Sequence, residues 1–214
     1  MVDVGIRRRH RRARERIAAA AIRYAEMGWP VVAGAHPIDV ACACDRVGCP
    51  APGAHPITPT WQLQATVDAA TIKRWWRSRP DANVLLVTGR VFDVLDMPAG
   101  AGRTALAHLG ANGPCGPVAA CGPDRFLFFT ITRGAPADEQ EWWSCHLDCV
   151  PDSVADTPGL RWHCRESYVL APPSRHASGE QVQWIRSPQE YPLLDPMVLL
   201  PVLADACEEA HAQR

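Results

Sequence analysis

The stretch Asn83-Val84-Leu85-Leu86-Val87-Thr88-Gly89-Arg90-Val91-Phe92-Asp93-Val94-Leu95-Asp96 contains two apolar runs with only Gly89-Arg90 between them. Short runs rich in valine, leucine and phenylalanine are typical of buried β-strands when turn residues bound them. A two-residue connection that contains glycine is typical of a tight hairpin turn, because glycine readily adopts the positive φ that such turns need. The stretch therefore predicts a hairpin of two strands, at residues 83–88 and 91–96.

Helices and further strands are predicted on both sides of this hairpin. Apolar residues recur at helical spacing in four segments, the first of which ends at Gly28 and the second of which begins after Asp68, a favourable N-cap. Hairpins mixed with helices indicate an α+β fold rather than a regularly alternating parallel sheet. The predicted helices are 16–27, 68–78, 103–109 and 197–211. The other predicted strands are 29–33, 118–121 paired with 125–132, 160–163, 168–171 and 181–185.

Length and composition narrow the class of protein. The chain has 214 residues and nine cysteines, an odd number. We expect one domain at residues 16–190, preceded by a basic extension at 1–15 and followed by a C-terminal helix within 191–214. Because no segment is typical of a signal peptide or a membrane span, we expect a cytoplasmic protein with reduced thiols and no membrane partner.

Three cysteines and a histidine lie close together between residues 42 and 55, in a segment made mostly of turn-forming residues. Thiolates and imidazole are the ligands that structural Zn²⁺ sites use, and a loop this short has no core of its own. The alternatives are a disulfide or a loop that merely contains thiols, but a Cys-x-Cys pair bridges poorly. We favour a zinc knuckle with the ligands Cys42, Cys44, Cys49 and His55.

Seven arginines crowd the segment between residues 7 and 16, although the formal net charge of the whole chain is only −1. A basic run of this kind can contact the phosphates of nucleic acid. A solvated N-terminal extension that only aids solubility explains the same run equally well.

Several segments in a fixed order resemble one family. They are Gly28-Trp29-Pro30-Val31, the knuckle ending in Gly53-Ala54-His55-Pro56, Thr71-Ile72-Lys73-Arg74-Trp75-Trp76, the strands at 83–89 and 93–96, and Tyr168-Val169-Leu170-Ala171-Pro172-Pro173-Ser174-Arg175-His176-Ala177-Ser178-Gly179. Over residues 16–190 the chain is similar to the N-terminal domain of bifunctional DNA primase/polymerases, in the archaeo-eukaryotic primase superfamily. The resemblance implies a sheet of the RNA-recognition-motif (RRM) type with helices packed on it and a zinc-bearing insertion.

The resemblance also implies where polymerase carboxylates should lie. The family places two of them as Asp-x-Asp at a strand end, because alternate residues on a strand point to one face and can hold metal ions together. Here Asp96 matches the first carboxylate and Pro98 occupies the position of the second. Asp93 lies three residues before Asp96, so it reaches the same face only through a β-bulge. A strand-end aspartate that caps a turn is an equally good interpretation of Asp96.

Two further family positions also depart from the pattern. The family's phosphate-contacting histidine corresponds here to Phe126, or to Arg125 if the register shifts by one residue, and arginine can hold phosphate whereas phenylalanine cannot. The third carboxylate position is taken by Arg161, and Glu166 is the nearest acidic residue. The candidate catalytic residues are therefore Asp96, Asp93 and Glu166. The residues that the resemblance implies for nucleotide binding are Arg125, His163, Ser174 and His176.

Two functions remain open from the sequence. The first is a catalytically degenerate primase/polymerase domain that binds nucleotide or nucleic acid. The second is an active, template-dependent nucleotidyltransferase that uses Asp96 with a non-standard second carboxylate and needs magnesium or manganese. In either case DNA or nucleotide is the expected partner, and another chain would supply the helicase or replication partner that is common in the family.

Overall fold

The computed structural model describes residues 2–39, 41–44, 46–110, 113–132, 159–165 and 167–212. The chain divides into two compact units, and we call residues 1–86 with 170–182 unit 1 and residues 87–169 with 183–214 unit 2. The paired strands of each sheet are antiparallel, and helices accompany them, so the predicted α+β class is confirmed. None of the helices in the described part of the chain is both long and apolar enough to span a membrane.

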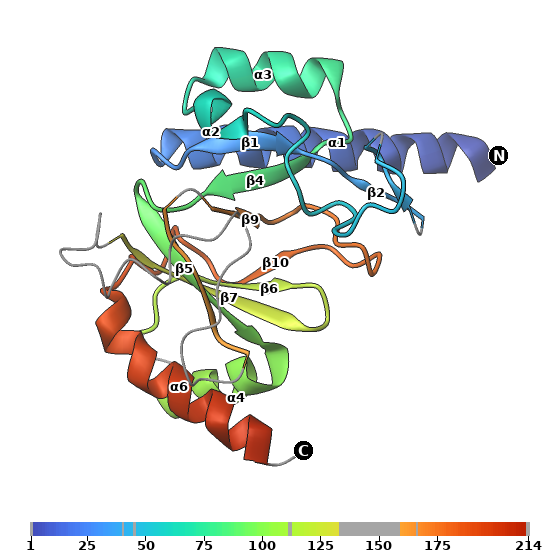
Figure 1. Cartoon of the computed structure of the whole chain (residues 1–214). Coiled ribbons are helices and arrows are strands. Elements are labelled where there is room, and N and C mark those ends of the chain that lie inside the picture. The colour runs from blue at the N-terminus through green and yellow to red at the C-terminus, as the bar shows by residue number, and fades with distance from the viewer. Residues whose placement is uncertain are drawn as a thin grey trace. The chain divides into compact units, whose positions relative to one another are not determined.

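Unit 1 combines helices with a small sheet (Figure 1). Ile17, Ala21 and Tyr24 on the first helix and Ile72 and Trp76 on the third are buried, because their spacing brings them to one face of each helix. The helices are α1 (Val2–Glu26), α2 (Trp61–Gln64) and α3 (Ala69–Ser78). The strands are β1 (Val31–Gly34), β2 (Pro37–Ile38), β3 (Ala41–Cys42) and β4 (Asn83–Val87), and β9 (Tyr168–Leu170) at the boundary completes the sheet order β1-β4-β9.

In the described part of unit 2, a five-stranded sheet has two helices on one face (Figure 1). Leu95 and Met97 of the sheet pack with Ala101 and Ala105 of α4 and with Leu203 of α6 in one buried apolar cluster. The strand order is β10-β6-β7-β5-β8. The elements are β5 (Phe92–Pro98), α4 (Ala99–Leu109), β6 (Val118–Cys121), β7 (Arg125–Ile131), β8 (Arg161–His163), β10 (Gln183–Arg186) and α6 (Pro196–Ala212).

The hairpin predicted at residues 83–96 is wrong. Strand β4 pairs with β1 and β9, whereas β5 pairs with β7 and β8 in the other sheet. Both strands are buried on both faces and each has a partner on either side, and the apolar pattern alone does not reveal which partners these are. Gly89 has a φ of 76°, and a Cβ there would lie 2.2 Å from Arg165 Cα. The glycine is therefore required by a close backbone approach rather than by a hairpin turn.

Other predicted elements agree with the structure except at two helix starts. The hairpin of β6 and β7 is confirmed, and the Asp68 carboxylate caps α3 by accepting from the backbone amides of Ala70 and Thr71. Helix α1 begins at Val2 rather than at residue 16, because the arginine-rich segment contains good helix formers and no proline. Helix α4 begins directly after Pro98 rather than at residue 103.

Candidate functional sites

The four predicted metal ligands meet in unit 1. The Sγ atoms of Cys42, Cys44 and Cys49 and a ring nitrogen of His55 all lie within 4.8 Å of one another. A tetrahedral ion with metal–sulfur bonds of about 2.3 Å holds sulfur atoms about 3.8 Å apart, so these positions fit such an ion. The short antiparallel pair of β2 and β3 brings the first cysteine to the site, and the turn-rich segment after it returns the chain to His55. These four residues could therefore hold a metal ion.

Hydrogen bonds orient two of the four predicted ligands, His55 and Cys42. His55 Nδ1 lies 2.8 Å from the Pro56 carbonyl oxygen, which can only accept, so this nitrogen carries the proton. The other ring nitrogen, Nε2, then has its lone pair available and lies 3.3 Å from Cys42 Sγ. The Gly53 amide donates to Cys42 Sγ at 3.4 Å. Burial opposes ionisation of the Cys42 thiol, but hydrogen bonds from the backbone of Gly53 and Cys44 and from the side chains of Cys44 and Cys49 together outweigh it and lower its pKa.

Asn83 connects the knuckle to the core of unit 1, although it was not among the predicted site residues. Its side chain is fully buried, and its Nδ2 donates to the carbonyl oxygens of Gly53 and Arg175, each at 2.8 Å. Its Oδ1 accepts from the Arg175 amide at 2.9 Å. An asparagine at the first position of an otherwise apolar strand was the available signal, because a buried amide needs partners.

In unit 2, the register of β5 decides which side chains share a face with Asp96. Strand β5 pairs with β7 residue by residue and without a bulge, from Phe92 opposite Ile131 to Pro98 opposite Arg125. On a regular strand a three-residue offset changes the face, so Asp93 and Asp96 point to opposite faces of the sheet. The strand therefore does not bring together the two aspartates that a shifted metal site would need.

The Asp96 carboxylate is held by two basic side chains. Arg125 Nε donates to Asp96 Oδ1 at 2.7 Å, and Arg125 Nη2 donates to the carbonyl oxygens of Asp96 and Gly159 at 3.0 Å and 2.9 Å. His163 Nε2 lies 3.3 Å from Asp96 Oδ2, and His163 Nδ1 lies 3.1 Å from Ser167 Oγ. Both carboxylate oxygens of Asp96 are thus already engaged by cationic or N–H groups.

The surroundings of Asp96 keep it ionised. Burial alone would raise its pKa, since only 6% of the residue is exposed. The hydrogen bond with His163 and the charges of His163 and Arg125 outweigh the burial and lower the pKa of Asp96. Its negative charge is therefore balanced by protein side chains within unit 2.

The structure also identifies which residue of β7 faces Asp96. Phe126 is buried in the cluster beneath the helices and contacts Gly102 of α4, where a Cβ would lie 2.5 Å from the phenylalanine ring. Arg125 lies on the other face and reaches Asp96. On β8, the partner of Asp96 is Arg161, which is exposed. Arg125 and Arg161 thus lie on the same face of the sheet as Asp96, and Phe126 lies on the opposite face.

The remaining predicted site residues lie elsewhere or outside the described residues. Ser174 belongs to unit 1 and is fully buried, where its hydroxyl accepts from the Val84 amide at 2.8 Å and donates to the Val84 carbonyl at 3.2 Å. His176, also in unit 1, is half-buried, and its Nδ1 lies 3.0 Å from Ser178 Oγ. Glu166 lies outside the described residues.

Comparison with known proteins assigns the chain to a family. Residues 21–201 match the family model of the bifunctional DNA primase/polymerase N-terminal domain, which covers most of the 214 residues. None of the curated proteins matches the chain significantly. The match includes both the knuckle and the Asp96 face, and it confirms the resemblance seen in the sequence. The chain therefore belongs to the family of bifunctional DNA primase/polymerase N-terminal domains.

Proposed function

We propose that this chain is a primase/polymerase domain that binds nucleotide or nucleic acid and whose polymerase metal site is degenerate. Family membership supports a role with DNA or nucleotide. The degenerate metal site is supported by one observation, the pairing of Asp96 with Arg125 and His163. This pairing occurs where the family pattern expects carboxylates around divalent cations. A cation there would have to compete with a guanidinium that already neutralises the carboxylate.

The topology of unit 2 supports an RRM-type sheet. The chain order is β5, α4, β6, β7 and then β8. Among these four strands, β5 and β7 are the two inner ones and β6 and β8 the two outer ones. Strand β7 lies between β5 and β6 and is antiparallel to both, which is the split β-α-β arrangement. An RRM-type sheet has the same arrangement. On this interpretation β10 is an additional strand beside β6, and α4 and α6 cover one face while Asp96 lies on the other.

Magnesium or manganese does not fit the described residues around Asp96. Hard divalent cations take oxygen ligands, commonly from two or more carboxylates. Asp93 points to the opposite face, Pro98 has no ligand atom, and Arg161 repels cations. We therefore derive no polymerisation step through these ions.

Zinc is the ion that we propose for the knuckle. Three thiolates and one imidazole are soft or borderline ligands, and four protein ligands complete a tetrahedron without leaving an open position for substrate. Such closed sites are structural, and binding of the ion contributes to the folding free energy of the loop. The knuckle residues would thus hold zinc to fix the loop, while the chemistry of nucleotide binding takes place elsewhere.

Helix α1 offers a surface for the phosphates of nucleic acid. Its N-terminal half is helical, and the described arginine side chains there are exposed on successive turns. Contacts between arginines and phosphates release counterions, so we expect weak, sequence-independent binding that falls steeply with salt. The exposed arginines in this half of the helix are Arg8, Arg9, Arg11, Arg12, Arg14 and Arg16.

A primer-extension assay tests the proposal. Unmodified protein is incubated with primed and unprimed templates and with Mg²⁺ or Mn²⁺, beside Asp96→Ala and Asp96→Asn variants. We expect no extension above the level of the variants, because the described residues on the Asp96 face offer no second carboxylate to help hold two cations. Robust incorporation by the unmodified protein that both substitutions abolish would instead establish the active nucleotidyltransferase.

A further inference from the structure

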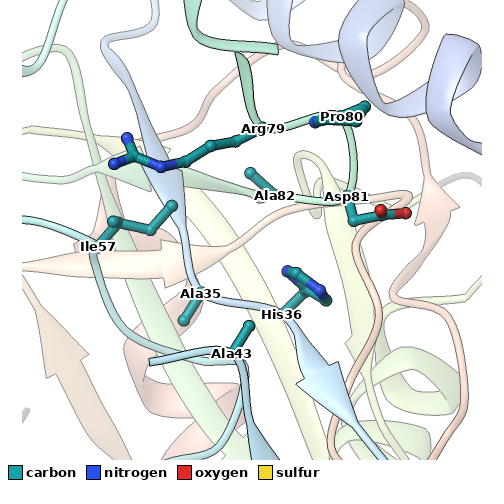
Figure 2. A pocket seen from close by; sticks show the side chains of 8 residues that line it. All are labelled: Ala35, His36, Ala43, Ile57, Arg79, Pro80, Asp81 and Ala82. Carbon is teal, nitrogen blue, oxygen red and sulfur yellow. The ribbon is translucent and has the colours of Figure 1, made fainter. Parts of the chain in front are cut away.

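A pocket of about 270 Å³ lies in unit 1 between the knuckle and the turn that connects α3 to β4. Figure 2 shows the Arg79 side chain extending from this turn toward Ile57, with His36 and Asp81 at the other end and alanine side chains between them. The knuckle forms part of the wall, because Ala43 lies between the ligands Cys42 and Cys44. The lining residues are Ala35, His36, Ala43, Ile57, Arg79, Pro80, Asp81 and Ala82.

The charge at this pocket is positive. Asp81 is engaged by Arg14 through two contacts, Nε to Oδ1 at 2.9 Å and Nη2 to Oδ2 at 2.6 Å, and Arg175 Nη2 lies 3.8 Å from Asp81 Oδ1. Arg14 and Arg175 thus lie beside Asp81, and Arg79 lines the pocket as a third arginine, so these four side chains carry a net charge of +2. Burial and the nearby Arg175 lower the pKa of His36, so its imidazole stays neutral at neutral pH and does not repel the arginines.

Arg79 is the cation that remains available to a ligand. It is exposed, and its guanidinium makes no hydrogen bond or ion pair with the described part of the chain. Its backbone amide is fixed by a hydrogen bond of 2.9 Å to the Trp75 carbonyl at the end of α3, so the base of the side chain is held in place. A guanidinium presents paired N–H donors that match the oxygens of a phosphate.

The size and lining of the pocket limit what it can hold. At about 30 Å³ for each water molecule, 270 Å³ corresponds to about nine waters, which is enough for a phosphate and the small organic group that carries it. Ile57 and the alanines offer apolar contacts for that group, and His36 offers a ring with one donor and one acceptor. A bare inorganic anion would leave this apolar part of the pocket unused.

We propose that this pocket binds a nucleoside phosphate, with Arg79 holding the phosphate and the apolar side chains around Ile57 contacting the base or sugar. The choice of a nucleoside as the organic group rests on the proposed function, whereas the choice of a phosphate rests on the arginines. The ligand is either a free nucleotide or one nucleotide of a single strand. The site lies in unit 1 and uses none of the residues on the Asp96 face.

Binding of deoxyadenosine monophosphate, followed by NMR titration of the metal-loaded full chain, tests the proposal. Replacing Arg79 with alanine should weaken binding about tenfold or more, as expected for loss of a charge-assisted bidentate contact. Arg79→Lys keeps the charge but not the paired donors, so its affinity should lie between those of the unmodified chain and Arg79→Ala. Arg77→Ala is the matched control, because it removes an exposed arginine from the last turn of α3, the helix directly before Arg79, and should change binding less than about twofold.

A second variant tests the pocket itself. Ile57 is only half-buried, so Ile57→Trp should fill the space without disturbing the core, and it should weaken binding while the melting temperature and metal content stay unchanged. A 5′-phosphorylated oligonucleotide and the same oligonucleotide without that phosphate are used to distinguish the two possible ligands, a single strand and a free nucleotide. Tighter binding of either oligonucleotide than of the monophosphate, lost in Arg79→Ala, identifies a single strand as the ligand, and tighter binding of the monophosphate identifies a free nucleotide.

The outcomes separate this proposal from the proposed function. The pocket proposal is overturned if neither the monophosphate nor the oligonucleotides saturate the protein, or if Arg79→Ala binds as tightly as the unmodified chain. It is also overturned if Arg77→Ala loses as much affinity as Arg79→Ala does. If Arg79→Ala changes the binding of neither the monophosphate nor DNA, the pocket proposal is removed and the proposed function stays intact. Binding of the monophosphate through Arg79 by a chain that does not bind DNA supports the pocket and removes the nucleic-acid part of the proposed function.

Discussion

Replacing Arg125 with alanine should destabilise unit 2 because it leaves the Asp96 carboxylate buried with one partner fewer. Arg125 makes three hydrogen bonds, to Asp96 Oδ1 and to the carbonyls of Asp96 and Gly159. Removing one partner of a buried ion pair costs about 3–5 kcal/mol. Because the Arg125 side chain is 22% exposed and His163 remains beside Asp96, we expect the lower end of that range, about 3 kcal/mol.

Urea unfolding and amide exchange in β5 measure this loss. A change of about 3 kcal/mol should lower the urea midpoint by about 1 M or more and speed exchange of the β5 amides. Arg161→Ala is the matched control, because Arg161 is exposed on the same face and pairs with Asp96 only through the strand register. Its effect should stay within about 0.5 kcal/mol. In the double variant Arg125→Ala/Asp96→Asn the loss should be smaller than the sum of the two single losses, because no unpaired charge is left buried.

The pH dependence gives an independent measure of the same contact. The folded-state pKa of Asp96 lies below its ordinary value, so its ionised form stabilises the fold at every pH above the unfolded pKa of about 3.9. That stabilisation is lost as the pH falls through the folded pKa. The stability difference between the unmodified chain and Asp96→Asn should therefore be constant near neutral pH and shrink in acid. An Arg125→Ala variant as stable as Arg161→Ala, with no change in this profile, would refute the structural role of the pair.

Three further predictions concern the metal, the helix and the knuckle. Purified protein should contain one zinc ion, and Cys49→Ser or a chelator should remove it and lower the melting temperature; elemental analysis without zinc contradicts this. Charge reversal at Arg8, Arg9, Arg11 and Arg12 should abolish most salt-dependent DNA binding, and unchanged affinity in a fluorescence anisotropy assay removes α1 from the interface. Asn83→Ala should cost about 2–3 kcal/mol in chemical unfolding, because it leaves buried backbone groups of Gly53 and Arg175 without their partner; a loss below about 0.5 kcal/mol argues against that role.

The sequence alone determined those features whose parts are close together in the chain. The four knuckle ligands span only residues 42–55, so their spacing predicted a cluster that the structure confirms. The cap of α3 at Asp68 and the hairpin of β6 and β7 were predicted for the same reason, since a cap or a tight turn is decided by residues a few positions apart. The family could be recognised because these local features occur in a characteristic order.

Only the tertiary structure decided which strands pair and which distant side chains meet. The apolar runs of β4 and β5 are adjacent in sequence but lie in different sheets, because a strand buried on both faces carries no mark of its partner. Asp96 and His163 are 67 positions apart and meet because β5 pairs with β8 in one register. A shift of that register by one residue would reverse the faces, and periodicity does not fix it. The neutralisation of Asp96 therefore follows from strand pairing, and the sequence alone could not reveal it.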